Sequence, residues 1–556
     1  MKHPIRSSVS RRAFLATPTV VSASGSLQAA PATSGEIGPL TPHQRRALAF
    51  HVRMQAAQFH KDAPLPDQIP NGDEQAFPNR IANFSKGLPH NSLGEVDLNA
   101  YQTLHSALAG GEQSALEAVP SGCMDPARRL KFVNPLAGMA CDLEGADSHR
   151  LAIPPAPRFN SAETTGEMVE LYWQALARDV PFIDYATSPL TQMAAAELSR
   201  MSDFRGPKLS GSVTPSTLFR GFTAGDLAGP YISQFLLKPV PFGSQYVEQR
   251  MRTTVAGLDY LTAFSDWLSL QNGCAPLAAE QYDPVRRYIR NGRDLATWVH
   301  RDVLFQAYFN ACLILLTPPD ASDQPTGGGI GAPLNPTNPY NALQAQMGFG
   351  TLGAPYAATM VAEAATRALK AVWFQKWFVH RRLRPEEFGG RVHNVRSGQP
   401  VNYPIHSDLL TSSALTEVFR RHSSYLLPQA YPEGAPLHPA YGAGHATVAG
   451  ACVTMLKALF DPSFVIPNPV VPSADGLSLV PYVGPALTVG GELNKLAANV
   501  GIGRNFAGIH WRSDYTQSLV LGEAVAINIL QDHKMTFAED FAGFAFPAFD
   551  GTPRTV

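Results

Sequence analysis

Two basic side chains, Lys376 and Arg384, stand eight residues apart in the segment KWFVHRRLRPEEFGG. Pro385 disfavours the α conformation at the residue before it, so the sequence predicts a helix break at Arg384. Two cations on either side of such a break can converge on one point and bind an anion. The other interpretation is a solvated basic face, with Arg381 and Arg382 complementing the negative end of a helix dipole. Taken alone, the segment favours this second interpretation.

The segment LHPAYGAGHATVAGACVTMLKALF places His438 and His445 on either side of a glycine-containing turn, ahead of a long apolar run. Gly442 and Gly444 let the backbone turn tightly and approach a ligand closely. Free N–H groups at the start of the following helix form an anion site, and His445 stands where it can exchange protons with the bound group. For a single histidine, a hydrogen-bonded structural role is the commoner one.

The segment GRNFAGIHWRSDYTQSLVLGEA adds Arg504 and His510 on either side of another glycine turn, with Asp514 four residues after His510. Asp514 can cap the next helix. It can also accept a hydrogen bond from His510 Nδ1, which leaves Nε2 as a neutral, oriented ligand. The sequence leaves both roles open, and one residue can serve both.

Together the three segments supply cations, a helix N-terminus and histidines for one pocket. Unpaired buried charges are expensive, so three cations can share a small pocket only when a multiply charged anion compensates them. The residues therefore predict a tetrahedral oxyanion such as phosphate or vanadate. The groups expected to hold it are Lys376, Arg384, Arg504 and the Gly444 N–H, with His445 and His510 as proton-transfer or ligand groups.

Helical periodicity dominates the elements that must position these residues. Predicted helices start at Pro42 with Thr41 as the cap, and cover 161–180, 294–316 as one buried helix, and 354–383. Further helices are expected after Gly444 and Ser513. The glycine-rich segment 325–342 lacks the Lys-Ser/Thr pair of a phosphate loop and is predicted to be a linker. Strand patterns are scarce, which indicates an all-α protein with long Pro/Gly-rich loops and few short strands.

Composition narrows the functional classes. The chain has 556 residues, 45% of them hydrophobic, enough to bury a large core. A net charge of −1 offers no field for nucleic acid or an anionic membrane, and we expect neither partner. No apolar run is long enough for a permanent membrane span. The five cysteines are too few for a disulfide framework; one bridge between Cys123 and Cys141 is allowed, and Cys452 is interpreted as a small buried hydrophobe.

The first thirty residues resemble a targeting segment. Paired arginines precede Phe14 and Leu15, a modest apolar stretch follows, and small residues surround Ala29 and Ala30. This pattern is similar to a twin-arginine export signal over residues 1–30, which predicts a folded protein exported to the periplasm or outside a bacterial cell. The alternative is a disordered basic tail.

The ordered set Lys-x7-Arg-Pro, Gly-x-Gly-His and Arg-x5-His-x3-Asp resembles the vanadium-dependent haloperoxidases, which share their site with the phosphatidic acid phosphatase type 2 and bacterial acid phosphatase superfamily. The match is nearest to the algal and cyanobacterial bromoperoxidase branch. It extends upstream through IPNGDEQAFPNRIANFSKGLPHNSLGEVD, TPSTLFRGFTAGDLAGPYISQFL and NGRDLATWVHRD. The resemblance implies two four-helix bundles in a single domain over 36–556, with the active-site core at 290–535.

Carried over by resemblance, His510 is the axial ligand of vanadium in one vanadate per subunit. Lys376, Arg384, Arg504 and the Gly444 N–H hold its equatorial oxygens.

The same resemblance makes His445 the acid/base that helps hydrogen peroxide replace an apical hydroxide. Lys376 then polarises the bound peroxide so that halide attacks it, and the hypohalous acid halogenates small organic molecules. His438, a histidine in bromoperoxidases and an aromatic residue in fungal chloroperoxidases, implies bromide and iodide over chloride. Relatives form dimers and dodecamers, so the resemblance also implies a homo-oligomer.

The sequence departs from the family at Ala443, where most members carry a serine that hydrogen-bonds vanadate. Losing that hydroxyl costs about 0.5–1.5 kcal/mol of binding free energy. We expect weaker or altered vanadate binding and not a dead site. A carboxylate pairing with His445 or Arg504 is also expected, and Asp302 is the candidate.

Two other functions fit the same residues. An acid phosphatase would use His510 as nucleophile and His445 as proton donor in the same anion cradle. A non-catalytic oxyanion-binding protein would need neither His445 nor His438.

Overall fold

The computed structural model describes residues 39–319 and 328–556. The chain divides into two units, with the boundary between Met54 and Gln55. The export signal predicted for residues 1–30 lies outside the described residues. All residues of the predicted site belong to the second unit, Gln55–Val556.

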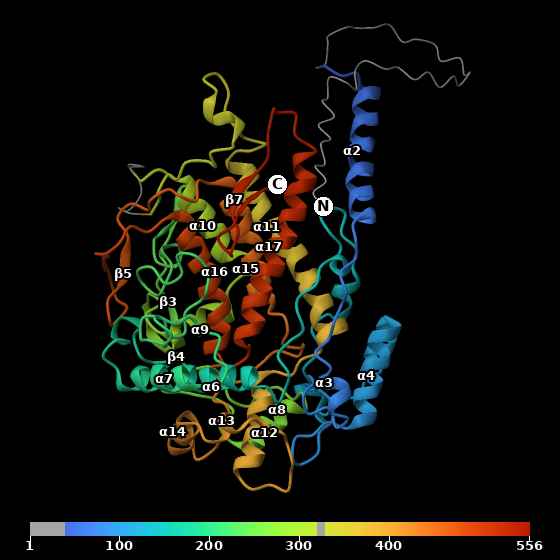
Figure 1. The fold of residues 1–556 in the computed structure, drawn as a ribbon, viewed down its shortest axis with the longest axis vertical. Coiled ribbons are helices and arrows are strands. Elements are labelled where there is room, and N and C mark those ends of the chain that lie inside the picture. Colours follow the sequence, from blue (N-terminus) through green and yellow to red (C-terminus); the bar gives the residue numbers. More distant parts are fainter. Residues whose placement is uncertain (1–38, 320–327) are drawn as a thin grey trace, which may run out of the picture. The chain divides into compact units, whose positions relative to one another are not determined.

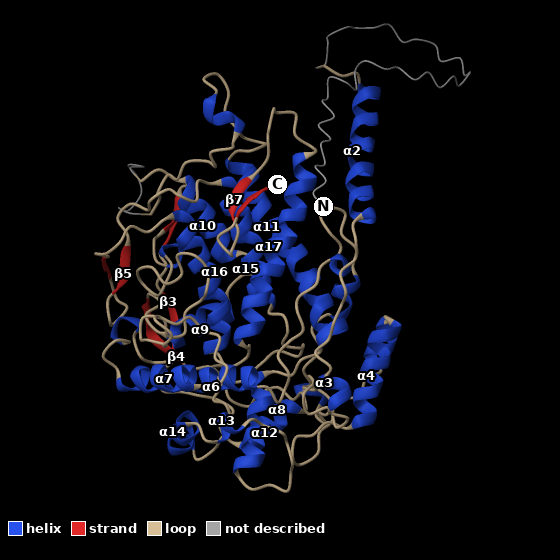
Figure 2. Ribbon diagram, viewed as in Figure 1, coloured by secondary structure: helices blue, strands red, loops and turns tan. Residues whose placement is uncertain are grey.

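Helices make up the long elements of the described chain, as the sequence predicts (Figure 2). The first eight are α2 (Pro42–Asp62), α3 (Asp73–Ala76), α4 (Leu98–Gly110), α5 (Gln113–Glu117), α6 (Ala162–Leu176), α7 (Pro189–Arg200), α8 (Phe264–Gln271) and α9 (Gly292–Arg301). The next eight are α10 (Gln306–Leu316), α11 (Ala354–Phe374), α12 (Pro385–Arg396), α13 (Ser407–Leu410), α14 (Ser413–His422), α15 (Gly444–Leu459), α16 (Val489–Phe506) and α17 (Arg512–Lys534).

Short 3₁₀ turns cover Pro126–Arg128, Pro135–Met139, Ser148–Arg150, Phe182–Asp184, Gln234–Leu236 and Pro339–Ala342. The strands of the described chain form four two-stranded antiparallel sheets. They are β1 (Val240–Phe242) with β2 (Gln245–Val247), β3 (Met251–Thr254) with β4 (Tyr282–Arg287), β5 (Val470–Pro472) with β6 (Leu479–Pro481), and β7 (Ala545–Pro547) with β8 (Pro553–Thr555). The all-α class with few short strands is confirmed.

Four helices, α11, α15, α16 and α17, pack on one another and form the bundle that carries the site (Figure 1). In α15 every residue except His445 is buried. Small residues allow this packing: a Cβ at Gly450 would lie 2.2 Å from the Leu519 carbonyl oxygen, and one at Gly522 would lie 2.0 Å from that of Thr447. The site histidine therefore sits at one end of a tightly packed central helix.

The single buried helix predicted for 294–316 is wrong. Helix α9 ends at Arg301, Asp302 is extended (φ −67°, ψ 152°), and α10 begins at Gln306. The Gln306 side chain accepts a hydrogen bond from the Val303 N–H at 3.1 Å and so stabilises the start of α10. No proline or glycine marks this break, so apolar periodicity ran across it.

The disulfide joins Cys123 to Cys274, and not to Cys141 as the sequence allowed. Cys141 is an exposed free thiol. An isolated backbone bridge between Arg129 and Cys274 brings the two segments together across the chain, a contact that cysteine spacing does not encode. Cys452 is fully buried, as expected for a small apolar residue.

Candidate active site

The helix break predicted at Arg384 is present. Helix α11 continues as a π-helical turn, Gln375–His380, which carries Lys376. Arg381 then takes a left-handed conformation (φ 41°), and the extended Arg384 (φ −80°, ψ 155°) caps α12 with Pro385 as its first residue. A proline fits this first position because its missing N–H would have no helical partner there.

Arg381 and Arg382 do not form the solvated basic face considered above. Arg381 pairs with Glu74 at 2.6 Å. Arg382 is buried, 3% exposed, and pairs with Glu167 at 3.0 Å and Asp514 at 3.2 Å. Sequence reasoning missed Arg382 because its carboxylate partners lie far away along the chain.

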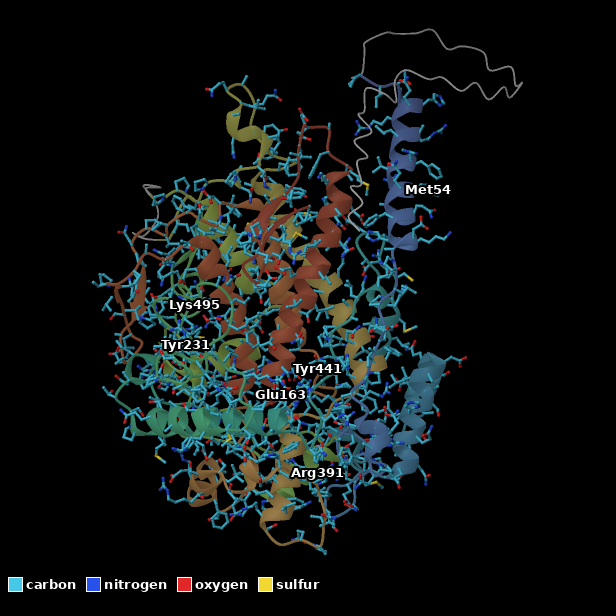
Figure 3. All side chains as sticks on the ribbon, viewed as in Figure 1. Met54, Glu163, Tyr231, Arg391, Tyr441 and Lys495 are labelled. Carbon is cyan, nitrogen blue, oxygen red and sulfur yellow. A yellow bond between two sulfur atoms is a disulfide. The ribbon has the colours of Figure 1, made fainter. Side chains whose placement is uncertain are left out.

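The turn into α15 brings the backbone against α11 and α17. Ala443 is the N-cap of α15 and donates its N–H to Ser518 Oγ at 2.8 Å. Gly444 follows as the first helical residue, where a Cβ would lie 3.1 Å from Trp373 Cζ3. Figure 3 shows Tyr441, on the same turn, near the lower end of the bundle in the view. Small residues are therefore required where this turn meets α11.

His510 lies in the turn between α16 and α17. Its Nδ1 lies 2.8 Å from Asp514 Oδ2, and the same oxygen accepts the Trp511 N–H at 3.0 Å. Asp514 thus serves both roles that the sequence left open. Arg384 Nη1 donates to His510 Nε2 at 2.9 Å, so Nε2 is the unprotonated nitrogen and the ring is neutral. Burial and the nearby Arg384 charge hold the pKa of His510 well below its usual range.

His438 lies between two cations. Lys376 Nζ is 2.9 Å from His438 Nδ1, and Arg384 Nη2 is 2.8 Å from the same nitrogen. Since both cations donate, Nδ1 is an acceptor and the His438 ring is neutral. Burial, together with the charge of Lys376, holds the pKa of His438 well below its usual range. The structure therefore places His438 in direct contact with both basic residues of the first segment.

Lys376 and Arg384 are both fully buried. Burial and the charge of Arg384 lower the pKa of Lys376 well below its usual range, and burial lowers the pKa of Arg384 to about 10. Trp373, missed by sequence reasoning, lies against Lys376, with the Nζ 4.8 Å from its ring centre. An aromatic face near the ammonium offsets part of the cost of burying its charge.

Arg504, on α16, is 8% exposed and donates from Nη1 to the Val299 carbonyl at 2.8 Å. Its guanidinium carbon lies 5.6 Å from the Tyr431 ring centre. Its Nε is buried and has no hydrogen-bond partner among the described residues. The Arg504 charge contributes to lowering the pKa values of Lys376 and Arg384, so the three cations belong to one electrostatic cluster.

His445 stands at the accessible side of the site, with its side chain 27% exposed. Its Nε2 lies 3.1 Å from Asp302 Oδ1. Asp302 lies at the break between α9 and α10 and pairs with His445, as expected from the sequence. The Asp302 side chain is 8% exposed, so the pair joins the buried site to the surface.

The donor set fits a multiply charged oxyanion. None of the ion pairs within residues 39–319 and 328–556 includes Lys376, Arg384 or Arg504. The N–H groups of Arg384 donate to backbone carbonyl oxygens and histidine rings. The Nε of Arg504 has no hydrogen-bond partner among the described residues. Three buried cations without carboxylates need an anion of their own. Lys376, Arg384 and Arg504 are the residues that could hold such a group, and His510 Nε2, which accepts from Arg384 here, is the candidate ligand.

Comparison with known proteins agrees with this chemistry. A family model described as the VCPO second helical-bundle domain matches residues 357–539. The chain is 38% identical to a vanadium-dependent bromoperoxidase of Ascophyllum nodosum, over 92% of each chain. It is 35% identical to one of Corallina pilulifera, over 92% of this chain and 98% of that one. A solved homohexameric vanadate-dependent bromoperoxidase from A. nodosum superposes with a TM-score of 0.88 at 31% identity, covering 98% of this chain and 95% of that chain.

Proposed function

The chain belongs to the vanadium-dependent haloperoxidase family, and on that premise we propose that it binds vanadate and uses hydrogen peroxide to oxidise bromide or iodide. Bromide, peroxide and one proton give hypobromous acid and water, and the hypohalous acid halogenates small organic molecules. The observation that carries the proposal is the cluster of Lys376, Arg384 and Arg504, which have no carboxylate partner among the residues that the structure describes, beside a neutral His510.

The residues of this chain divide the work between holding the cofactor and moving protons. Bound vanadate supplies a Lewis-acidic centre that activates peroxide. Lys376, Arg384, Arg504 and the Gly444 N–H would compensate the charge on its oxygens, and His510 Nε2 would be its protein ligand. Asp514 keeps the His510 proton on Nδ1, 2.8 Å away, and so keeps Nε2 unprotonated. We expect one vanadate per subunit.

Proton transfer falls to His445. Its Nε2 is directed at Asp302 Oδ1, which leaves Nδ1 to exchange a proton with a bound reactant. A histidine held in this way can accept and return a proton at Nδ1. His438 accepts hydrogen bonds from Lys376 and Arg384 and orients both. The similar proteins are named bromoperoxidases, which supports a preference of this chain for bromide over chloride.

Export and assembly complete the proposal. The twin-arginine pattern in residues 1–30 and the Cys123–Cys274 disulfide both support a periplasmic or extracellular location, because disulfides persist in oxidising compartments. None of the helices in the described ranges combines the length and hydropathy of a membrane span. The similarity to a homohexameric protein supports a homo-oligomer. The family resemblance implies a dimer or a dodecamer, and a mass measurement would determine the number of subunits.

The first experiment is bromination of monochlorodimedone with bromide and peroxide, using vanadate-free protein before and after vanadate is added. We expect bromination only after addition. Hydrolysis of para-nitrophenyl phosphate that vanadate abolishes, with no bromination, would establish the acid phosphatase instead.

The variant His445→Ala separates catalysis from binding. We expect it to keep its vanadate in equilibrium dialysis while halide oxidation falls roughly 10²–10⁴-fold, the usual loss of an acid/base group. Unchanged oxidation by this variant would remove His445 from the mechanism. A wild-type protein that binds vanadate and never brominates would be the non-catalytic binder.

A further inference from the structure

A surface pocket of about 540 Å³ opens beside the active site. Its walls come from β3, β4, α9 and the start of α10, and the first three of these lie close together (Figure 1). The lining residues include Arg252, Tyr282, Trp298, Arg301, Asp302 and Gln306. Asp302 belongs to both places, since its Oδ1 also receives His445 Nε2. The pocket therefore begins one hydrogen bond away from the proton-transfer residue.

One wall of the pocket is fixed by internal bonds. Tyr282 donates its hydroxyl to Glu280, and Arg301 donates to both Glu280 and the Tyr282 oxygen, the latter at 3.1 Å. Because Arg301 and Glu280 pair with each other, their opposite charges cancel and add no net charge to the pocket. The wall presents a rigid aromatic surface.

Arg252 is the charged residue of the pocket that has no ion-pair partner in the described chain. Its guanidinium carbon lies 3.8 Å from the Tyr282 ring centre, and the residue is exposed. It forms none of the ion pairs found in the described chain. A guanidinium stacked on an aromatic ring keeps its edge donors free, and this edge matches a carboxylate. Asp302, which also lines the pocket, is itself a carboxylate and would repel an anionic group.

We propose that this pocket binds the organic acceptor of the reaction, an electron-rich aromatic molecule that carries a carboxylate, such as a hydroxyphenyl acid. The carboxylate binds Arg252, the ring packs against the aromatic residues of the lining, Tyr282 and Trp298, and the hydroxylated end faces Asp302. The pocket volume suits a molecule of this size. This inference rests on the proposed halide oxidation, which supplies the halogenating species.

The acceptor step balances without another reagent. The ring supplies an electron pair to bromine of hypobromous acid, a C–Br bond forms and the O–Br bond breaks. The ring proton leaves with the hydroxide as water. A phenol held against Asp302 would meet hypobromous acid as it leaves the His445 side of the site, before it escapes to bulk solvent.

The binding test uses 3-(4-hydroxyphenyl)propionate and tyramine, which share a phenol ring and carry opposite charges. Isothermal titration of the vanadate-free protein should show the acid binding and the amine not binding. Arg252→Gln should weaken the acid about tenfold, the effect of one charge-assisted hydrogen bond. Arg286→Gln is the matched control, because Arg286 faces Arg252 across the β3–β4 ladder but does not line the pocket. No binding of the acid, or equal loss in both variants, would overturn the assignment.

The second test is a competition on the vanadate-loaded protein, with the acid and amine in equal amounts. The ratio of brominated acid to brominated amine should exceed the ratio given by added hypobromous acid, and Arg252→Gln should return it to that value. Equal ratios for wild type and free reagent would mean that the halogenating species simply diffuses away. Triiodide formation from iodide checks halide oxidation separately: without it the proposed function fails, and the titration still decides whether the pocket binds the acid.

Discussion

Ala443 is the residue at which this site departs from its family, and its surroundings show what a serine would change. The residue is 1% exposed and caps α15 directly before Gly444. Its N–H is already used by Ser518 Oγ at 2.8 Å, so the Ser518 hydroxyl is bonded to the turn. With no hydroxyl on residue 443, the groups that remain to hold the oxyanion are the Gly444 N–H, the three cations and His510.

We predict that Ala443→Ser strengthens vanadate binding by roughly 2–10-fold, because one added hydroxyl donor contributes about 0.5–1.5 kcal/mol. Equilibrium dialysis of vanadate measures the effect. Serine is also a better N-cap than alanine, so the melting temperature of the vanadate-free variant must be recorded as a control. An affinity that stays the same while the melting temperature rises would mean that the new hydroxyl only caps the helix.

At the residue scale, the sequence predicted which side chains meet but not all of their neighbours. Residue type and local spacing were enough for Asp514 with His510, because both lie in one turn. Pairing of Asp302 with His445 was expected only through the family resemblance. Trp373, Ser518 and the buried Arg382 were missed, since their roles depend on contacts between distant helices that no local pattern records.

The end of α9 is the element that links the active site to the rest of the surface. His300, in its last turn, lies 2.8 Å from Glu280 and 2.5 Å from Glu433, and its ring stacks on Tyr431 at 3.7 Å between centres. Tyr431 in turn lies under Arg504. A protonated His300 therefore ties two loops to the helix that ends at Asp302.

This network makes stability depend on pH. Burial opposes the charge on His300, but hydrogen bonds with Glu280 and Glu433 outweigh it and raise the pKa of His300. A raised pKa stabilises the fold fully below the unfolded-state value of about 6.5, and the stabilisation is lost as pH rises through the higher folded-state pKa. We predict that the melting temperature falls over this interval and that His300→Gln flattens the profile. Parallel profiles for the two proteins would show that another group titrates there.

Helix prediction failed where periodicity carried no information. Helix α16 was not predicted, because all but one of its eighteen residues are buried and they include asparagine, lysine and glycine, so it has no polar face. The break between α9 and α10 was missed because the apolar residues of 294–316 were interpreted as one run, although His300, Arg301 and Asp302 stand at the break. Helix α6, from the spacing of its apolar residues, and the break at Pro385 were found from local signals.

At the scale of the whole molecule, one covalent link connects distant parts of the second unit. Cys123 and Cys274 are separated by 151 residues in the chain. A bridge that closes so long a loop lowers the entropy of the unfolded chain. The pairing was beyond sequence reasoning, because it follows from how the segments around Arg129 and Cys274 come together.

Removing this bridge with Cys123→Ser and Cys274→Ser should cost about 5 kcal/mol and lower the melting temperature by roughly 5 °C. Calorimetry in the presence and absence of a reductant measures it. Cys141→Ser is the control, because that thiol is free and exposed. Equal melting temperatures for the oxidised wild type and the double variant would mean that the bridge does not stabilise the fold.

The π-helical turn at Gln375–His380 also constrains how the length of the chain can change. Deleting one residue from α11 would rotate the two sides of the deletion by about 100° relative to each other. Either the buried face of α11 would leave the bundle, or Lys376 would leave Arg384 and His438. Insertions and deletions should therefore be found in surface hairpins, such as the turn between β5 and β6 with its exposed Asp475. Helix α11 should keep its length in every related protein that keeps the site.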